Sequence, residues 1–215
     1  MKIQKFESRE KWMEGRLGKI TGTRLDKIVV KKGTGKKIGF YELIAERLSV
    51  TEEDFEGYIP NETPMDRGTR LQKFAIDRFS KETGKKINEE LVMWAREDND
   101  KIAISPDAII VDDNGEFGGE EAIECKCLAS SRHIEAFLNN EIPDEYRMQI
   151  IQYFCVNDDL KKMYMVFYDP RIPAKDFFYL TIDRKDVQEE VEQYLEYQIK
   201  TLQEVDKIVN SLSNF

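Results

Sequence analysis

The sequence predicts a mixed domain of the α/β or α+β class, and three observations support this prediction. Apolar residues recur at spacings of three and four in several stretches, which indicates amphipathic helices. Runs rich in β-branched and aromatic residues lie between these stretches, bounded by turn-forming residues, and indicate strands. The 215 residues, of which 40% are apolar, suffice for one core and not for a second full domain.

The first helices are expected over residues 39 to 49 and 64 to 82. The acidic, turn-rich stretch between them, residues 50 to 64, is the nearest candidate for a hinge. Strands are expected next, over residues 91 to 95, 101 to 111 and 120 to 127. Asp112-Asp113-Asn114-Gly115 has the composition of a turn, so the last two strands are expected to form a hairpin.

The second half of the chain alternates in the same way. Helices are expected over residues 130 to 140 and 143 to 156, the latter with Pro143 in its first turn, and strands over 163 to 168 and 177 to 182. A long amphipathic helix closes the chain, with Asp183 as its N-cap. Its apolar stripe consists of Val191, Leu195, Ile199, Leu202, Val205, Val209 and Leu212.

Composition excludes some classes of protein. No apolar run approaches the length of a membrane helix, and the first 30 residues lack the apolar core of a secretory signal, so we expect a cytoplasmic protein without a membrane span. The three cysteines, Cys125, Cys127 and Cys155, are odd in number and poorly spaced for a disulfide or a zinc site, which favours reduced core thiols.

The net charge of −9 is unevenly distributed. Residues 1 to 48 carry 13 lysines and arginines against six acidic residues, a balance of +7, so the other 167 residues carry −16. This asymmetry fits a basic face that binds phosphate groups on an otherwise acidic body. It also fits a solvated lysine-rich surface, and charge alone leaves both interpretations open.

The most informative segment is Ser105-Pro106-Asp107, followed seventeen residues after the aspartate by Glu124-Cys125-Lys126. Side chains alternate along a strand, so Glu124 and Lys126 share one face. If the two strands pair, Asp107 approaches Glu124, and two neighbouring carboxylates favour a hard cation such as Mg²⁺ or Mn²⁺ between them. This is the layout of a phosphodiesterase. The alternative is a turn at Asp107 and an exposed Glu124–Lys126 pair on an edge strand.

Together with other motifs along the chain, these segments resemble those of a known family. The chain is similar to the bacteriophage lambda exonuclease group, the YqaJ-type viral recombinases of the PD-(D/E)xK nuclease superfamily. The resemblance implies a restriction-endonuclease-like core, with a central mixed β-sheet flanked by helices. Its motifs are Gly15-Arg16-Leu17-Gly18-Lys19-Ile20-Thr21-Gly22-Thr23, Arg67-Gly68, Ser105-Pro106-Asp107, Glu124-Cys125-Lys126, Ser131-Arg132, Tyr146 with Gln149, and Tyr168-Asp169-Pro170-Arg171.

The resemblance also implies roles for individual residues. Asp107, Glu124 and the main-chain carbonyl of Cys125 look like metal ligands, Lys126 like the catalytic lysine and Gln149 like the active-site glutamine. Four further residues match positions that grip the 5′-phosphate of a DNA end: Arg16, Thr23, Ser105 and Arg132. The alternative interpretations are that Arg16 and Arg132 are solvated surface arginines and that Thr23 caps a helix. His133 is expected to be a surface histidine, and Trp12, Trp94 and Tyr153 to be packing residues.

One position departs from the family pattern. The second helix usually carries a metal-binding glutamate after Arg-Gly-x-x-Leu, where this chain has Gln72. An amide oxygen can bind a cation but brings no negative charge, which leaves a second metal in doubt. Gln72 therefore leaves open a site with one ion, an impaired site or an engineered change.

The resemblance implies a function. The expected activity is that of a hydrolase, a Mg²⁺-dependent exonuclease that digests double-stranded DNA ends from 5′ to 3′ and leaves 3′ overhangs for recombination. It further implies a homotrimeric ring, a single-strand annealing protein as partner, and a phage or prophage protein in a bacterial host cell. Residues 1 to 65 would be a helical DNA-end-binding portion, 66 to 182 the catalytic core and 183 to 215 the terminal helix of a single domain. An endonuclease and a catalytically impaired DNA-end-binding protein remain alternatives.

Overall fold

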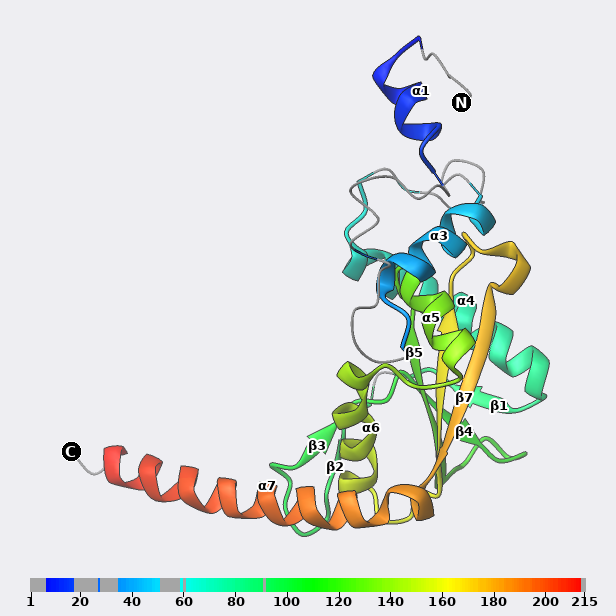
Figure 1. The fold of residues 1–215 in the computed structure, drawn as a ribbon. Coiled ribbons are helices and arrows are strands. Elements are labelled where there is room, and N and C mark those ends of the chain that lie inside the picture. The colour runs from blue at the N-terminus through cyan, green and yellow to red at the C-terminus, as the bar shows by residue number, and fades with distance from the viewer. Residues whose placement is uncertain are drawn as a thin grey trace. The chain divides into compact units, whose positions relative to one another are not determined.

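The structure is a computed structural model that describes residues 7–17, 27, 35–50, 59, 61–90 and 92–213. The chain divides into two compact units, each described here by itself. The first unit combines Met1–Leu71, Cys127–Glu141 and Phe167–Phe178, and the second combines Gln72–Lys126, Ile142–Val166 and Tyr179–Phe215. The elements are labelled in Figure 1.

The first unit is mainly helical. It contains α1 (Arg9–Glu14), α3 (Ile38–Leu48), the start of α4 (Pro64–Thr83), α5 (Ser130–Asn139) and the short 3₁₀ helix η2 (Pro173–Lys175). Helix α3 packs against α5, and Tyr41, Ala45 and Ile134 from their apolar faces form a small core with Ile172, which precedes η2. The Tyr41 hydroxyl donates a hydrogen bond to Asn139 at 3.0 Å, so the polar tip of this core residue is satisfied.

A buried ion pair fixes the start of α5 in this unit. Asp169 is 1% exposed and accepts hydrogen bonds from the Ser130 hydroxyl at 2.6 Å and from the Arg171 guanidinium at 2.7 Å. Arg171 also donates to the carbonyl of Leu128 at 2.9 Å. These contacts satisfy the buried carboxylate and tie α5 to the end of a strand.

A five-stranded sheet with the order β1-β4-β5-β6-β7 runs through the chain. The strands are β1 (Lys86–Asn88), β4 (Ala108–Val111), β5 (Phe117–Lys126), β6 (Lys162–Tyr168) and β7 (Phe177–Asp183). Strand β4 pairs antiparallel with both β1 and β5. The hairpin predicted around Asp112–Gly115 is thus confirmed, and Gly115 has the positive φ of 84° that its turn requires. Helices and strands together confirm the predicted mixed class.

Two helices complete the second unit, α6 (Asp144–Val156) and α7 (Arg184–Ser213), and they pack against each other. Arg184 lies where α7 begins and donates to the carbonyl of Phe154 at 2.7 Å and to that of Leu160 at 2.8 Å. The guanidinium therefore satisfies one carbonyl group in the last turn of α6 and one in the loop that follows the helix. Among the described residues, no helix is long and apolar enough to span a bilayer.

The structure corrects three local predictions. The strand expected over 101 to 111 is broken into β3 (Ala103–Ile104) and β4, because Pro106 lacks an N–H and interrupts the ladder. β3 pairs instead with the short β2 (Trp94–Ala95) in a separate sheet. Pro143 is the N-cap of α6 and not a first-turn residue. His133 is fully buried in α5 and not on the surface, because it lies on the inward face of the helix.

Candidate active site

The hairpin register brings the two predicted carboxylates together. Ala108 pairs with Ile123, so Asp107 and Glu124 form the next pair, and opposite residues of an antiparallel pair point to the same side of the sheet. Asp107 Oδ2 accepts a hydrogen bond from the backbone N–H of Cys125 at 2.7 Å. Glu124 is only 3% exposed and lies on β5, which has neighbours on both sides. The alternative of an exposed pair on an edge strand is therefore wrong.

Three side chains donate hydrogen bonds to the Glu124 carboxylate. Oε1 accepts from Lys126 Nζ at 2.5 Å and from Gln149 Nε2 at 2.7 Å, while Oε2 accepts from the Tyr153 hydroxyl. Gln149 and Tyr153 are four residues apart on α6 and therefore share one helix face. Glu124 is thus held from its own strand and from α6.

Burial and like charge act on Asp107. Burial, and then the negative charge of Glu124, raise the pKa of Asp107 to about 6, against the lowering effects of the Cys125 N–H, Lys126 and a hydrogen bond from Gln72. The two carboxylates repel each other, and a cation between them would relieve that repulsion. Burial and the Glu124 charge also raise the pKa of Tyr153, so its phenol stays protonated as a donor.

The donor set at this place fits a hard cation. Asp107 and Glu124 offer carboxylate oxygens, and Gln72, which interacts with Asp107, offers an amide oxygen. No group of three or more histidine, cysteine, aspartate or glutamate side chains suited to a metal occurs in the part of the chain that the structure describes. Among the described residues, the site thus combines two carboxylates, Asp107 and Glu124, with the uncharged amide of Gln72.

The residues predicted to grip a 5′-phosphate are placed only in part. Ser105 is exposed, two residues before Asp107 in the second unit. Arg16 and Arg132 belong to the first unit, where Arg132 pairs with Glu135 one turn along α5. Thr23 lies outside the described residues. The grouping of these four residues stays a prediction.

Sequence reasoning missed two contributions to the site. Tyr153 was expected to be a packing residue, and it is fully buried, but its hydroxyl also contacts Glu124. Tyr146 places its ring 4.8 Å from Lys126 Nζ, a cation–π contact that orients the lysine. The available signal was the spacing of Tyr146, Gln149 and Tyr153 on one face of α6. Cys125 and Cys155 are buried, as predicted for core thiols, whereas Cys127 is only partly buried.

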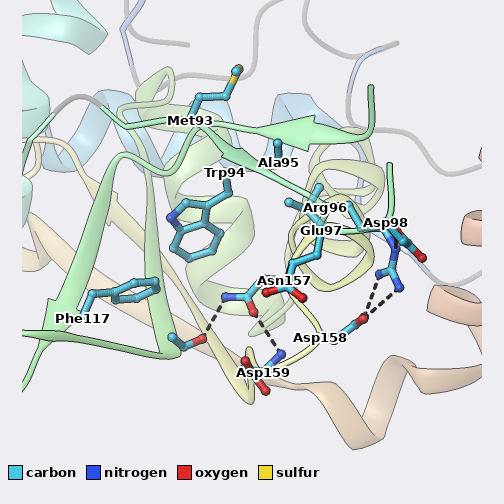
Figure 2. Close-up of a pocket in the computed structure, with 12 residues that line it drawn as sticks. Met93, Trp94, Ala95, Arg96, Glu97, Asp98, Phe117, Asn157, Asp158 and Asp159 are labelled. Atoms are coloured by element: carbon cyan, nitrogen blue, oxygen red, sulfur yellow. Dashed lines mark hydrogen bonds and ion pairs between the residues drawn. The ribbon is translucent and has the colours of Figure 1, made fainter. Parts of the chain in front are cut away.

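A pocket of about 730 Å³ lies beside this site in the second unit, and Figure 2 shows the residues that line it. Trp94 stacks on Phe117 at 5.1 Å between ring centroids, and its ring meets that of Tyr153 edge-on at 6.1 Å. Acidic residues outnumber basic ones in the lining, because Arg96 is accompanied by Glu97, Asp98, Asp158 and Asp159. This charge balance disfavours phosphate binding in the pocket.

The comparisons with known proteins agree with this geometry. A family model described as the YqaJ-like viral recombinase domain matches residues 11–159. An alkaline exonuclease (LHK-Exo) from Laribacter hongkongensis has a similar structure, with 25% sequence identity and a TM-score of 0.58 over 95% of this chain and 98% of that chain. LHK-Exo in complex with dAMP is similar at 26% identity and a TM-score of 0.52, over 93% and 99% of the two chains. No curated protein matches significantly. The Asp107–Glu124–Lys126 group around the buried Glu124, its α6 partners and the family match over most of the chain lead to one conclusion: the protein belongs to the YqaJ-like viral recombinase family.

Proposed function

We propose that the protein is a metal-dependent exonuclease that digests double-stranded DNA ends from 5′ to 3′ and leaves 3′ single-stranded overhangs for recombination by strand annealing. The observation that supports this proposal most is the convergence of Asp107 and Lys126 on the buried Glu124, with Gln149 bound to the Glu124 carboxylate as well. The family and the similarity to an alkaline exonuclease support DNA as the substrate.

The resident ion would be Mg²⁺, with Mn²⁺ as a substitute. Asp107, Glu124 and the carbonyl of Cys125 would hold it, and the Gln72 amide is a further ligand without charge. When bound, such an ion polarises a phosphate oxygen and lowers the pKa of a bound water. Burial of Glu124 helps here, since water competes less for the carboxylate oxygens.

Lys126 and Gln149 would act on the reacting groups. The Lys126 side chain is 19% exposed, so it is shielded and still accessible to a phosphate at the site. It can orient the attacking water and stabilise the negative charge that builds up in the transition state. The Gln149 amide keeps one donor on Glu124 and can offer the other to the water or the scissile phosphate.

The 5′-phosphate of the DNA end would be held by Arg16, Thr23, Ser105 and Arg132. A guanidinium forms two parallel hydrogen bonds with a phosphate, and hydroxyl groups add further donors. Arg132 would then exchange its partner Glu135 for the DNA. A ring-shaped homotrimer would keep the enzyme on its substrate, and a single-strand annealing protein would receive the overhang, in a phage or prophage setting within a bacterial cell.

Two alternatives differ in measurable ways. An endonuclease with the same site would cut closed circular DNA, and an impaired member with Gln72 would bind DNA ends without cutting them. The test is incubation of linear and closed circular duplexes with Mg²⁺, beside EDTA and an Asp107→Ala variant. Mg²⁺-dependent loss of linear DNA alone, abolished in the variant, is the expected result, and equal cleavage of circles would contradict exonuclease activity.

A further inference from the structure

Tyr153 is a fully buried side chain that touches both carboxylate-bearing segments of the candidate site. Its hydroxyl donates a hydrogen bond to Glu124 Oε2 on β5 and lies 3.2 Å from the carbonyl oxygen of Ser105. Ser105 belongs to the segment that carries Asp107. A phenol has a single proton, and the carboxylate is the stronger acceptor, so the Tyr153 hydroxyl donates mainly to Glu124 and only in part to the carbonyl.

The Tyr153 ring has little freedom to move. It is 0% exposed, and the edge of Trp94 packs against it with an angle of 88° between the ring planes. The position of α6 fixes the direction of the Tyr153 side chain. Gln149, one turn earlier on the same helix, binds the other oxygen of the Glu124 carboxylate and so holds this helix face against Glu124. The hydroxyl is therefore held at a defined point between Glu124 and the Ser105 carbonyl.

Without this hydroxyl, Glu124 would be directed only by Lys126 and Gln149, which both bind Oε1. Oε2 would then be a buried carboxylate oxygen with no side-chain donor among the described residues, and the carboxylate would be free to turn toward Lys126. Glu124 and the Ser105–Asp107 segment would also lose the hydroxyl group that contacts both of them. Metal affinity depends on such outer contacts, which commonly contribute a factor of 10 to 100.

We propose that Tyr153 is a positioning residue that orients Glu124 relative to the segment carrying Asp107, so that both carboxylates face one cation. This inference rests on the proposed metal site and gives Tyr153 a role beyond packing. Tyr153 contacts neither DNA nor metal in this role. It acts through Glu124 and the Ser105 carbonyl.

The test compares Tyr153→Phe with a matched control, Tyr164→Phe. Tyr164 is another buried tyrosine of the second unit, and its hydroxyl donates to Glu121 at 3.1 Å, but Glu121 points to the opposite face of β5 from Glu124. Both variants remove one hydroxyl from a tyrosine–glutamate pair, and only one pair belongs to the site. Asp107→Ala serves as the variant without a metal site.

The primary measurement is the dissociation constant of Mn²⁺ from each purified protein by titration calorimetry, without DNA. We expect Tyr153→Phe to weaken Mn²⁺ binding by about 10- to 100-fold and Tyr164→Phe to leave it within about twofold of wild type. In the DNA digestion assay, Tyr153→Phe should need correspondingly more Mg²⁺ for half-maximal rate and should recover most of the rate at saturation. If Tyr153 had only a structural role, both Tyr153→Phe and Tyr164→Phe would have a lower unfolding temperature, and neither variant would need more metal.

Two contrary results can be told apart. Unchanged Mn²⁺ affinity in Tyr153→Phe, with binding lost in Asp107→Ala, would overturn the role of Tyr153 and leave the metal site intact. Equal Mn²⁺ binding by wild type and Asp107→Ala would overturn the metal site and the inference with it. If Tyr153→Phe does not fold, Trp94→Ala replaces it, because loss of the ring edge should release Tyr153 and weaken Mn²⁺ binding about threefold. Unchanged affinity in Trp94→Ala would then count against the proposal.

Discussion

At the scale of single residues, the Glu124 carboxylate is the centre of the candidate site. A buried carboxylate is costly unless it is paired and fully hydrogen-bonded. Glu124 meets this condition with an ammonium, an amide and a phenol as donors. Two of these donors are neutral, so much of the negative charge of Glu124 remains available to a cation.

Replacing Lys126 separates chemistry from binding. Lys126→Met should reduce the cleavage rate of linear duplex DNA by about 10²- to 10³-fold, because a donor to the transition-state charge is lost. DNA-end affinity should fall by much less. The matched control is Lys161→Met, since Lys161 forms an exposed pair with Glu120 on the same strand, β5. Equal rate losses in the two variants, measured in single-turnover digestion, would contradict a catalytic role for Lys126.

Gln72 is the second position with a clear prediction. Gln72→Glu places a third carboxylate beside Asp107, which should strengthen Mg²⁺ binding by about tenfold, because each added negative ligand favours a hard cation. Without metal, the same change should lower stability through like-charge repulsion. Calorimetric titration and thermal unfolding with and without Mg²⁺ measure both effects. Identical affinities for Gln72→Glu and wild type would place residue 72 outside the metal site.

The candidate site was largely predictable at this scale, and the reason is local. Strand alternation and turn composition place Asp107, Glu124 and Lys126 together without knowledge of the rest of the fold. Tyr153 was predicted as core, which is right for its ring and incomplete for its hydroxyl. Sequence gives no sign of where a buried hydroxyl finds its acceptor, since that depends on how α6 lies over β5.

At the scale of elements, helices were predicted more accurately than strands. The limits of α3, α4, α5 and α7 agree with the predicted ranges to within about two residues, because each has a long apolar stripe. The strand expected over 101 to 111 contains Pro106. Before this proline β3 pairs with β2, and after it β4 pairs with β1 and β5. Strand β1 was missed because three residues carry too short a pattern.

Helix α5 provides a prediction on stability and pH. His133 is buried, donates a hydrogen bond from Nε2 to the Lys175 carbonyl at 2.9 Å, and lies near Asp169, Arg171 and Asp176. Burial lowers the pKa of His133 below its ordinary value of about 6.5. Below pH 6.5 the unfolded chain therefore binds more protons than the folded chain, and stability falls as the pH drops toward the folded pKa.

The test uses urea midpoints at pH 7.5 and pH 5.0 for wild type and His133→Gln, which keeps a hydrogen-bond donor for the Lys175 carbonyl. We expect the loss of stability on acidification to be smaller in His133→Gln than in wild type. The difference between the two proteins removes the contribution of other titrating groups. The same loss in both would show that His133 does not couple folding to pH.

At the scale of the whole molecule, the terminal helix raises the question of assembly. The first half of α7 packs on α6, and Val191 is buried there. Further along the helix, four apolar residues are about half or more exposed: Val205, Ile208, Val209 and Leu212. Sequence periodicity could not distinguish these two halves, because both repeat at spacings of three and four.

If the protein is a homotrimer, sedimentation should give three times the chain mass of 25.2 kDa. An exposed apolar stripe is expected to be covered in such an assembly, so Val209→Lys with Leu212→Lys should shift the distribution toward monomer. Glu196→Lys, on the polar face of the same helix, is the control. A wild-type monomer at micromolar concentration would rule out a stable trimer.

The proposed activity itself is best tested by strand-resolved digestion of a linear duplex with Mg²⁺, in which one 5′ end is phosphorylated and each strand carries its own label. Wild type should shorten the phosphorylated strand from its 5′ end and leave the complementary 3′ end intact, and Asp107→Ala should do neither. Shortening from 3′ ends, internal cuts, or equal digestion by Asp107→Ala would contradict a 5′-to-3′ exonuclease that works through the Asp107–Glu124 site.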